Sequence, residues 1–463
     1  MQTATAALAR HIVATSFADL PPQVVREAQR RIADVVAAGL SGSTTPVGTR
    51  IKQFAQKNAQ AGTAVIWGSD VRVAPAYAAL ANGTMAFHLE LDDVHRTSHT
   101  HPGVTTIPAA LALAEQNGLS GKDLLLAVVL GYDAQARIGL AVSPSIYVDR
   151  TYLAPGTLGI FGATAAAAKL LKLDADTTGG ALSAASYLGP LAPFETFRLG
   201  APAKDTIMGW ANFSGLHAAD LAAHGFGGPQ TGLEGEYGYC KTVSARYDMA
   251  RLYDQLGRRF EILQTGIKPY ACCRQHHSAI DAVLEIKERE KLSHDQVASV
   301  KLRTFVVASR GSNKTPDSVP AAKYSAPYTI ALALALGQNR REQYTMELIR
   351  DASLLHLASR VEVVADADLE ALYDEKWPSI VEITTKDGRL LSARRDLPKG
   401  EPEFPISDTE LKDKFLSLAT DCVSADRAEA IWAAIFKLDE IDDLAHLTEL
   451  LKGGTPVSPR QAR

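Results

Sequence analysis

Titratable side chains are concentrated in one segment of the chain, residues 82–103. Pro102-Gly103 ends the segment, and this pair favours a turn and stops any helix that reaches it. Alanine-rich stretches of helical pattern, 76–86 and 107–115, flank it. We therefore expect a loop, held between two buried helices, that presents groups for acid–base catalysis. The groups are four histidines and three carboxylates: His88, His95, His99, His101, Glu90, Asp92 and Asp93.

Two other interpretations of this segment remain open. Charged side chains are common on solvated loops, where they need no function. His95 and His99 are four residues apart, so on a helix they would share a face and bind zinc, iron or manganese together with carboxylates. The sequence has no His-Glu-x-x-His pattern and no Cys-x-x-Cys pair, and Pro102 disfavours a long helix. Proton transfer without a metal is the interpretation we favour.

The composition is that of an ordinary globular protein. Of 463 residues, 46% are hydrophobic and 22% charged, and the net charge of −4 argues against disorder and against a nucleic-acid-binding surface. Four cysteines, two of them adjacent at Cys272 and Cys273, make no disulfide framework and favour a reducing compartment. The first 17 residues lack the pattern of a signal peptide, and no uninterrupted apolar stretch is long enough to cross a membrane. We predict a cytoplasmic protein without membrane or nucleic-acid partners.

Hydrophobic periodicity predicts a mainly α fold with a large all-helical domain. Helical patterns fill residues 1–265, and many are rich in alanine, leucine and glycine, whose small side chains let helices pack closely. After prolines 398, 402 and 405, residues 408–452 are helical again. We expect the C-terminal helices, within 401–463, to return to this first domain.

A smaller α+β domain is predicted for residues 266–400. Alternating polar and apolar residues predict a strand at 298–307. Lys386-Asp387-Gly388 is a hairpin turn signal between two further strands, 380–385 and 389–395. Helices are expected at 278–290, 326–336 and 344–350.

Several motifs, in this order, resemble the MmgE/PrpD family, which includes 2-methylcitrate dehydratase, cis-aconitate decarboxylase and iminodisuccinate epimerase. The resemblance covers nearly the whole chain. It implies a helical domain with a smaller α+β domain, a homodimer, a pocket between the domains, small polycarboxylate substrates, and no required metal or organic cofactor. The motifs are Asn82-Gly83 with His88 and Leu91-Asp92-Asp93, His101-Pro102-Gly103 with 107–115, the lysine-bearing segment 200–209, the glycine-rich segment 225–235, the second histidine motif 268–281, and the proline-rich segment 397–405.

Carried over by position, the resemblance implies roles for particular residues. His101 is the histidine before proline, Lys204 the pocket lysine, and His277 the histidine of the second domain, with Arg274 nearby. The chain departs from the family at two places. Glu90 occupies a position where aspartate is usual, and Val94 occupies that of a threonine, so the way a substrate is held should differ.

The chemistry of these side chains suits reactions next to a carboxylate, which need a base, an acid and positive charge for the developing enediolate. Arginine and lysine can hold carboxylates, and an imidazole can exchange protons near neutral pH. Asp92 or Asp93 could orient such an imidazole. Equally, they could cap the following segment or pair with Arg96. We assign catalytic roles to His101, Lys204, His277 and Asp93, substrate-binding roles to Glu90, Asp92, Arg274, Tyr152 and Thr157, and no metal ligands.

Glycines at 156, 159 and 162 resemble a dinucleotide loop in spacing, but no strand precedes them, so we expect close helix packing instead. Cys272 and Cys273 are interpreted as small buried residues. Many alanine-rich helices of the first domain, including 107–114 and 163–171, have few polar residues, and we therefore expect some of them to pack against a second subunit. Lys204 and His277 should face one cleft between the domains.

The predicted function is that of a cofactor-independent lyase or isomerase that removes a proton alpha to a carboxylate of a small di- or tricarboxylate. Dehydration, as in 2-methylcitrate dehydratase, is placed first because it is the activity most associated with the family. Decarboxylation of the cis-aconitate type and epimerisation of the iminodisuccinate type are alternatives. A metal-dependent hydro-lyase and a non-catalytic metabolite-binding protein are alternatives of other classes.

Overall fold

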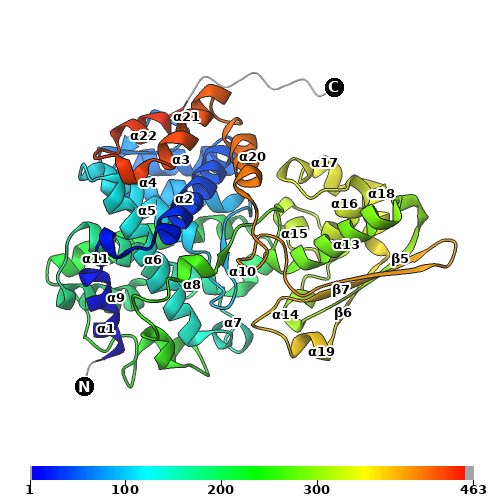
Figure 1. Ribbon diagram of the computed structural model, residues 1–463, viewed down its shortest axis with the longest axis horizontal. Coiled ribbons are helices and arrows are strands. Elements are labelled where there is room, and N and C mark those ends of the chain that lie inside the picture. The colour runs from blue at the N-terminus through cyan, green and yellow to red at the C-terminus, as the bar shows by residue number, and fades with distance from the viewer. Residues whose placement is uncertain (1–2, 454–463) are drawn as a thin grey trace.

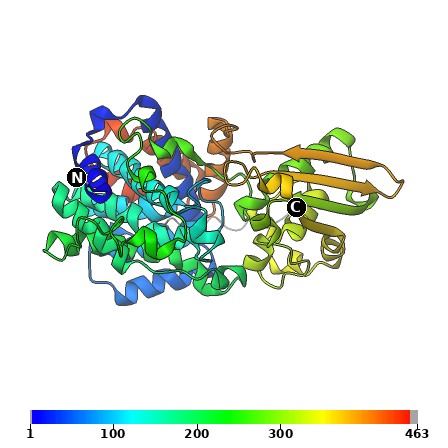
Figure 2. The same ribbon diagram turned by 90° about the horizontal axis from the view of Figure 1, so that it is seen from below.

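The computed structural model describes residues 3–453 as a helical lobe and a smaller lobe built on a four-stranded sheet, which lie side by side (Figures 1 and 2). Residues 1–2 and 454–463, the outer ends of the predicted helical domain, lie outside the described residues. The mainly α class predicted from the sequence is confirmed.

The helical lobe is formed by the first part of the chain, where alanine and glycine let helix axes approach. A Cβ atom on Gly131 of α6 would lie 2.4 Å from Thr106 Cγ2 of α5, and one on Gly162 of α8 would lie 2.4 Å from Thr106 Oγ1. The glycines of α8 therefore serve helix packing, as predicted, and not nucleotide binding. Its helices are α1 (Ala4–Ala14), α2 (Pro22–Gly42), α3 (Pro46–Asn58), α4 (Pro75–His88), α5 (Pro102–Gln116), α6 (Gly121–Val142), α7 (Ser145–Val148), α8 (Ala154–Leu170), α9 (Ala175–Leu188), α10 (Phe194–Arg198), α11 (Ile207–Ala223) and α12 (Tyr239–Val243).

One prediction for this lobe needs correction. Pro102 does not end a helix but begins α5, because proline at the first helical position lacks only an N–H that the helix would leave unpaired. Among the described residues, one helix, α6, is long and apolar enough to cross a membrane by length and composition, although Asp133 and Arg137 interrupt its apolar sequence. Its most apolar window is completely buried inside the protein.

Helices 107–114 and 163–171 do not need a second subunit to bury their apolar surface. Residues Ile107 to Ala114 of α5 are all buried within the chain, and so is nearly all of α8. These two helices are therefore unsuited to a subunit interface, and the expectation that some helix of this lobe meets a second subunit stays a prediction. Exposed apolar side chains occur instead on α11, where Trp210 is 44% exposed and Leu221 39% exposed.

The smaller lobe contains a mixed sheet in the order β6-β5-β7-β8, with β5 and β6 parallel and the other pairs antiparallel. Side chains of β7 alternate between buried and partly exposed, so one face of the sheet packs on helices, among them α13 and α16. The predicted hairpin is present, with Gly388 at φ +88° in the turn between β7 and β8. Strand β6 was not predicted. The elements are β5 (Val297–Thr304), β6 (Val361–Ala365), β7 (Ser379–Thr385), β8 (Leu390–Arg395), α13 (His277–Glu290), α14 (Val306–Ser309), α15 (Val319–Lys323), α16 (Ala326–Leu336), α17 (Met346–Ile349), α18 (Ala352–Ser359) and α19 (Ala367–Glu370).

The C-terminal helices lie on the helical lobe, beside α2 (Figure 1). Helix α20 (Asp408–Ala419) packs along α2, and α21 (Ala425–Ile435) and α22 (Ala445–Leu450) follow it. The side chain of Lys414 on α20 reaches inward and bonds Asp34 of α2, with Nζ 2.6 Å from Oδ1. The division of the chain at residues 265 and 400 stays a prediction, but these contacts join the tail to the first lobe.

Two short antiparallel strand pairs complete the fold. One joins β1 (Ala64–Val65) and β2 (Arg72–Val73). The other joins β3 (Val94–His95), within the histidine-rich segment, to β4 (Thr265–Gly266), which leads into the smaller lobe. This second pair brings the histidine-rich segment against the start of the second histidine motif.

Candidate active site

A cavity lies between the lobes, and its empty space, open mouth included, is about 600 Å³. The helical lobe supplies Glu90, Val94, His99 and His101 to its wall, and the residues after β4 supply Lys268, Cys273, Arg274, Gln275, Tyr324 and Trp377. Apolar and aromatic side chains cover most of the rest: Phe87, Tyr147, Leu153, Ala154, Pro155, Phe194, Phe197 and Met208.

The histidine-rich segment is not a solvated loop. Glu90 is 3% exposed, and Asp92 and Asp93 are completely buried. Glu90 has φ +57° and His99 φ +54°, so the backbone turns in the left-handed region at both residues. Buried carboxylates need partners, and the partners of these come from across the fold.

The pairing of β3 with β4 determines the first partner. Val94 lies opposite Gly266 in the antiparallel register, so Asp92, two residues before Val94, and Lys268, two residues after Gly266, come together on the same side. Lys268 Nζ lies 3.2 Å from Asp92 Oδ1 and 3.5 Å from Glu90 Oε2. Lys268 is completely buried, and its ammonium therefore depends on these two carboxylates.

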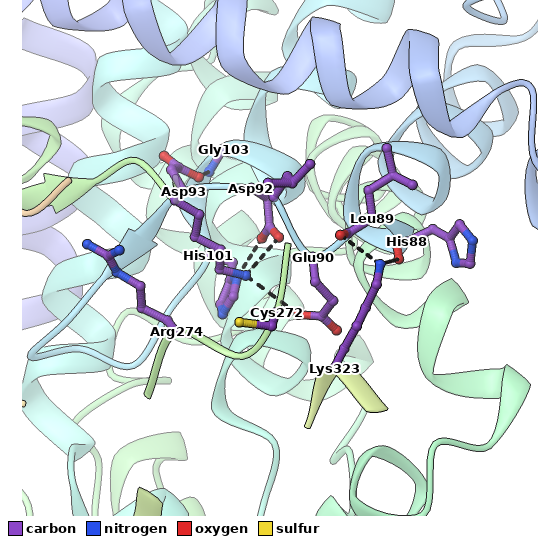
Figure 3. Close-up of polar contacts among 12 residues, drawn as sticks. His88, Leu89, Glu90, Asp92, Asp93, His101, Gly103, Cys272, Arg274 and Lys323 are labelled. Carbon is purple, nitrogen blue, oxygen red and sulfur yellow. Dashed lines mark hydrogen bonds and ion pairs between the residues drawn. The ribbon is translucent and has the colours of Figure 1, made fainter. Parts of the chain in front are cut away.

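Asp92 also binds the catalytic candidate His101. Its Oδ2 forms a short hydrogen bond with His101 Nδ1, which leaves Nε2 as the ring nitrogen free for a ligand in the cavity (Figure 3). Burial alone would raise the pKa of Asp92, but the charges of Lys268 and His101 outweigh it and hold that pKa at about 2. Asp92 is therefore ionised at working pH and favours a proton on Nδ1 of His101.

A second row of ion pairs lies behind Glu90. Lys204 Nζ is 3.0 Å from Glu90 Oε1 and 3.0 Å from Asp205 Oδ1, and Asp205 Oδ2 is 3.1 Å from His88 Nδ1. Burial disfavours the charge of Lys204, but Glu90 and Asp205 outweigh this and raise its pKa. Lys204 therefore borders the site through Glu90, with its ammonium 5.1 Å from the centre of the Phe87 ring.

Arg274 lines the opposite wall, and its guanidinium is bound by groups on the side away from the cavity. Its guanidinium donates to Glu401 Oε1 at 2.7 Å and to the Lys399 carbonyl at 2.8 Å. His277 Nδ1 lies 2.9 Å from Arg274 Nη1, and His277 Nε2 lies 3.2 Å from the Cys272 carbonyl. His277 is completely buried and does not line the cavity.

Two models of known domains match the chain. The MmgE/PrpD N-terminal domain matches residues 6–252, and the MmgE/PrpD C-terminal domain matches residues 270–440. The chain belongs to the MmgE/PrpD family.

Curated relatives in this family span nearly the whole chain. The human cis-aconitate decarboxylase is 28% identical over 474 residues, covering 98% of this chain and 96% of the relative. The cis-aconitate decarboxylase of Aspergillus terreus is 25% identical, covering 94% of this chain and 92% of the relative. The mitochondrial 2-methylcitrate dehydratase of Yarrowia lipolytica is 24% identical, covering 83% of this chain and 73% of the relative. The chain is therefore an enzyme of a family whose named relatives are lyases.

The residues assigned from the family resemblance lie at different distances from the cavity. Glu90, His101 and Arg274 line the cavity, Asp92 and Lys204 contact those that do, and His277 lies behind Arg274. Neither Lys204 nor His277 lines the cavity, so the expectation that both face one cleft is wrong. The partners of His277 hold its ring away from the cavity, so it can act only through Arg274.

Asp93 was predicted to be catalytic, but it points away from the cavity (Figure 3). Its Oδ1 accepts the Gly103 N–H at 2.9 Å and its Oδ2 accepts the Tyr132 hydroxyl at 2.6 Å. Burial raises its pKa to about 6. The alternative that Asp93 caps the following segment is confirmed, because Gly103 is in the first turn of α5. Arg96 pairs with Glu401 and Glu403 instead.

Tyr152 and Thr157 also lie outside the cavity wall, although Leu153, Ala154 and Pro155 between them line it. Thr157 is 1% exposed, and its hydroxyl accepts the Ala192 N–H at 3.1 Å. Both residues therefore help to shape the wall from behind. In this arrangement neither side chain reaches the cavity, contrary to the substrate-binding roles predicted for them.

The two histidines proposed as a metal pair have separate partners. His95 Nε2 is 3.2 Å from Glu261 Oε2, whereas His99 Nε2 is 2.7 Å from the Tyr373 hydroxyl and 3.2 Å from Asp374 Oδ1. They belong to a strand and a turn, so they share no helical face. Within residues 3–453, no three His, Cys, Asp or Glu side chains converge as a metal-ligand set.

Sequence reasoning missed several groups in the wall. Lys268 begins the second histidine motif, but no local signal marks it as a site residue, because its approach to Asp92 depends on the pairing of β3 with β4. Tyr147, Tyr324 and Trp377 have no local signal, because distant segments bring them to the cavity. Cys273 also lines it, but burial raises the pKa of its thiol to about 12, which keeps it protonated.

Proposed function

We propose that this protein is a lyase that acts on a small polycarboxylate and transfers a proton to or from a carbon next to a carboxylate. The observation that carries this proposal is His101, at the cavity wall, with Nδ1 on the ionised Asp92 and Nε2 left for the substrate. The hydrogen bond to Asp92 holds the imidazole ring in place, so that Nε2 is the nitrogen that can exchange a proton with the substrate. Lys268 keeps Asp92 ionised in a buried setting.

Substrate carboxylates would be held by the cations of the wall. Arg274 and Lys268 line the cavity, and Lys204 lies behind Glu90. In the same positions these charges would stabilise an enediolate as it forms. Glu90 lies among the cations and has two of them as partners, so it sets how many positive charges remain for a substrate.

Decarboxylation of an unsaturated tricarboxylate of the cis-aconitate type is our first candidate for the overall reaction. Relatives that carry this name cover nearly the whole chain. The carbon–carbon bond to one carboxylate would break, CO₂ would leave, and the electron pair would remain on carbon, conjugated with a neighbouring carboxylate. His101 Nε2–H would then give its proton to that carbon. One proton donor is enough, and the His101–Asp92 pair supplies it.

Dehydration of a hydroxy acid, which the sequence placed first, is the second candidate, and a relative named 2-methylcitrate dehydratase supports it. His101 would remove the alpha proton as a base, and a second group would have to protonate the departing hydroxide. Tyr147 and Tyr324 line the cavity, and burial raises their pKa values so that both stay protonated and can donate. Epimerisation, our third alternative, would need proton donors on both faces of the substrate carbon.

The experiment is a screen of cis-aconitate, methylcitrate, citrate, malate, tartrate and aspartate-like acids in D₂O. Evolved CO₂ with one deuterium in the product identifies decarboxylation, loss of water identifies dehydration, and deuterium in recovered substrate identifies epimerisation. Failure of every acid would refute the proposal and favour a metabolite-binding protein. Loss of activity on chelation, restored by a divalent metal, would favour a metal-dependent hydro-lyase instead.

We also propose that the protein is a homodimer, with an interface that includes α11. Trp210 stacks on Phe213 with ring centres 5.2 Å apart, and Phe213 contacts His217 at 4.5 Å. These side chains are spaced by three and four residues, so they form a stripe on one face of the helix. Trp210 and Leu221 on this helix are exposed in the single chain.

A further inference from the structure

Lys323 is a buried cation next to the site with no role in the proton-transfer step. It is the last residue of α15 in the smaller lobe, and its side chain crosses to the helical lobe. Nζ lies 2.8 Å from the Leu89 carbonyl and 3.5 Å from the His88 carbonyl (Figure 3). It thus binds the carbonyls at the end of α4, which the helix itself leaves unpaired.

The position of this contact matters because the next residue is Glu90. Glu90 has φ +57°, a left-handed backbone conformation that is unfavourable for glutamate and persists only where contacts with the surrounding structure stabilise it. The Glu90 N–H bonds the Phe87 carbonyl at 2.9 Å on one side of this turn, and Lys323 fixes the Leu89 carbonyl on the other. Glu90 in turn binds both Lys204 and Lys268. Fixing this turn therefore fixes the positions of the two ammonium groups.

Stability alone does not explain a lysine here. Lys323 is 5% exposed, and among the ion pairs of residues 3–453 none includes it. Its partners are two carbonyl dipoles and the Tyr344 ring, whose centre is 5.5 Å from Nζ. A buried charge without a counter-ion costs free energy that an apolar side chain of the same length would not. Burial accordingly lowers the pKa of Lys323 to about 8, although Glu90 opposes the shift.

We propose that Lys323 is a positioning residue for the lyase reaction. It links the smaller lobe to the turn at Glu90, and through Glu90 it fixes the positions of Lys204 and Lys268, the ammonium groups that bind substrate carboxylates. It acts through Glu90 and does not line the cavity. The inference rests on the proposed function, because it needs Lys204 and Lys268 to bind a polycarboxylate. Different results would refute the proposed function and the role of Lys323. If the wild-type protein turns over none of the acids, the proposed function is wrong. If the wild type is active and a Lys323 variant has the same kinetic constants, only the role of Lys323 is wrong.

The first test replaces the ammonium and keeps the stem, in Lys323→Met. We expect KM to rise about tenfold or more, with a smaller fall in kcat, because the variant loosens carboxylate binding and leaves His101 and Asp92 in place. The matched control is Lys287→Met. Lys287 also lies in the smaller lobe and donates to a carbonyl near a helix end, that of Leu334 in α16, but it does not line or adjoin the cavity wall. Its KM should be that of the wild type.

The second test uses Lys323→Arg, which keeps a charge at every working pH. The charged groups around Lys323 are Glu90, Lys204, Asp205 and Lys268, with the Tyr344 ring. Wild-type kcat/KM should fall as pH rises through about 8, because Lys323 then loses its proton. In Lys323→Arg this fall should move to higher pH, a change that a merely structural residue would not cause.

Two outcomes would overturn the inference. One is a folded Lys323→Met variant with KM within twofold of the wild type. The other, decisive if Lys323→Met does not fold, is a Lys323→Arg variant whose alkaline fall in kcat/KM coincides with that of the wild type.

Discussion

Replacing His101 by asparagine removes the group that we expect to move the proton. Asparagine keeps a hydrogen bond to Asp92 but cannot exchange protons near neutral pH. General acid–base catalysis contributes about 10²- to 10⁴-fold, which corresponds to roughly 3–5 kcal/mol of transition-state free energy. We therefore expect kcat to fall by about 10²-fold or more, with little change in KM.

The fold should tolerate this change. Asp92 also pairs with Lys268, which is 3.2 Å away in the wild type, so the substitution leaves no buried charge without a partner. Urea denaturation should accordingly give a free energy of unfolding within about 1 kcal/mol of the wild type, since His101 is only partly buried and contributes little packing.

The assay is turnover of the best acid from the screen, with deuterium incorporation from D₂O followed by mass spectrometry. His99→Asn is the matched control, because His99 lines the same cavity two residues away and asparagine accepts its positive φ. A His101→Asn variant that keeps more than a tenth of wild-type kcat would refute the mechanism. Equal losses in the two variants would show that the imidazole of His101 has no special part in the reaction.

Three further predictions follow from the contacts around the site. Lys204→Met should raise KM and lower the free energy of unfolding by about 3 kcal/mol or more, because Glu90 and Asp205 lose a shared buried partner; wild-type KM in steady-state kinetics would contradict this. Asp93 has a folded-state pKa of about 6 against 3.8 in a model peptide, so its contribution to stability is present below about pH 4 and is lost as pH rises through 6. Asp93→Asn does not titrate, and its stability relative to the wild type, measured in urea, should increase by up to about 3 kcal/mol from pH 4 to pH 7, at roughly 1.4 kcal/mol per pH unit; an equal difference at both pH values would exclude the raised pKa. Trp210→Glu should convert a dimer to a monomer in light scattering at micromolar concentration, and a wild-type monomer would remove the proposed assembly.

Lys204 is 4% exposed and has two carboxylate partners, so it contributes to the stability of the fold as well as to the site. Lys204→Met therefore tests binding and stability together. To separate the effect on binding from the effect on stability, KM must be measured in conditions where the variant is folded.

Local sequence was enough to predict much of the fold. Helix α16 begins and ends where the apolar pattern does, and the Lys386-Asp387-Gly388 turn joins β7 and β8 as expected, because both depend on interactions between near neighbours in the chain. The proline at the start of α5 was misinterpreted, since the same residue can begin or end a helix and only the course of the backbone decides which. Strand β6 was missed because it gains its partners from β5, some sixty residues earlier in the chain.

The sequence also pointed to His101, Glu90 and Arg274, which line the cavity, because unusual residue types were close together in short motifs. It could not decide between Asp92 and Asp93, or place His277. Successive side chains of an extended segment point to opposite sides, so one of two adjacent aspartates meets His101 while the other caps α5. Which one does so depends on the register of β3 with β4, a pairing between segments about 170 residues apart. That register also brings Lys268 to Asp92, so the tertiary structure alone assembles the charges that make His101 a proton-transfer group.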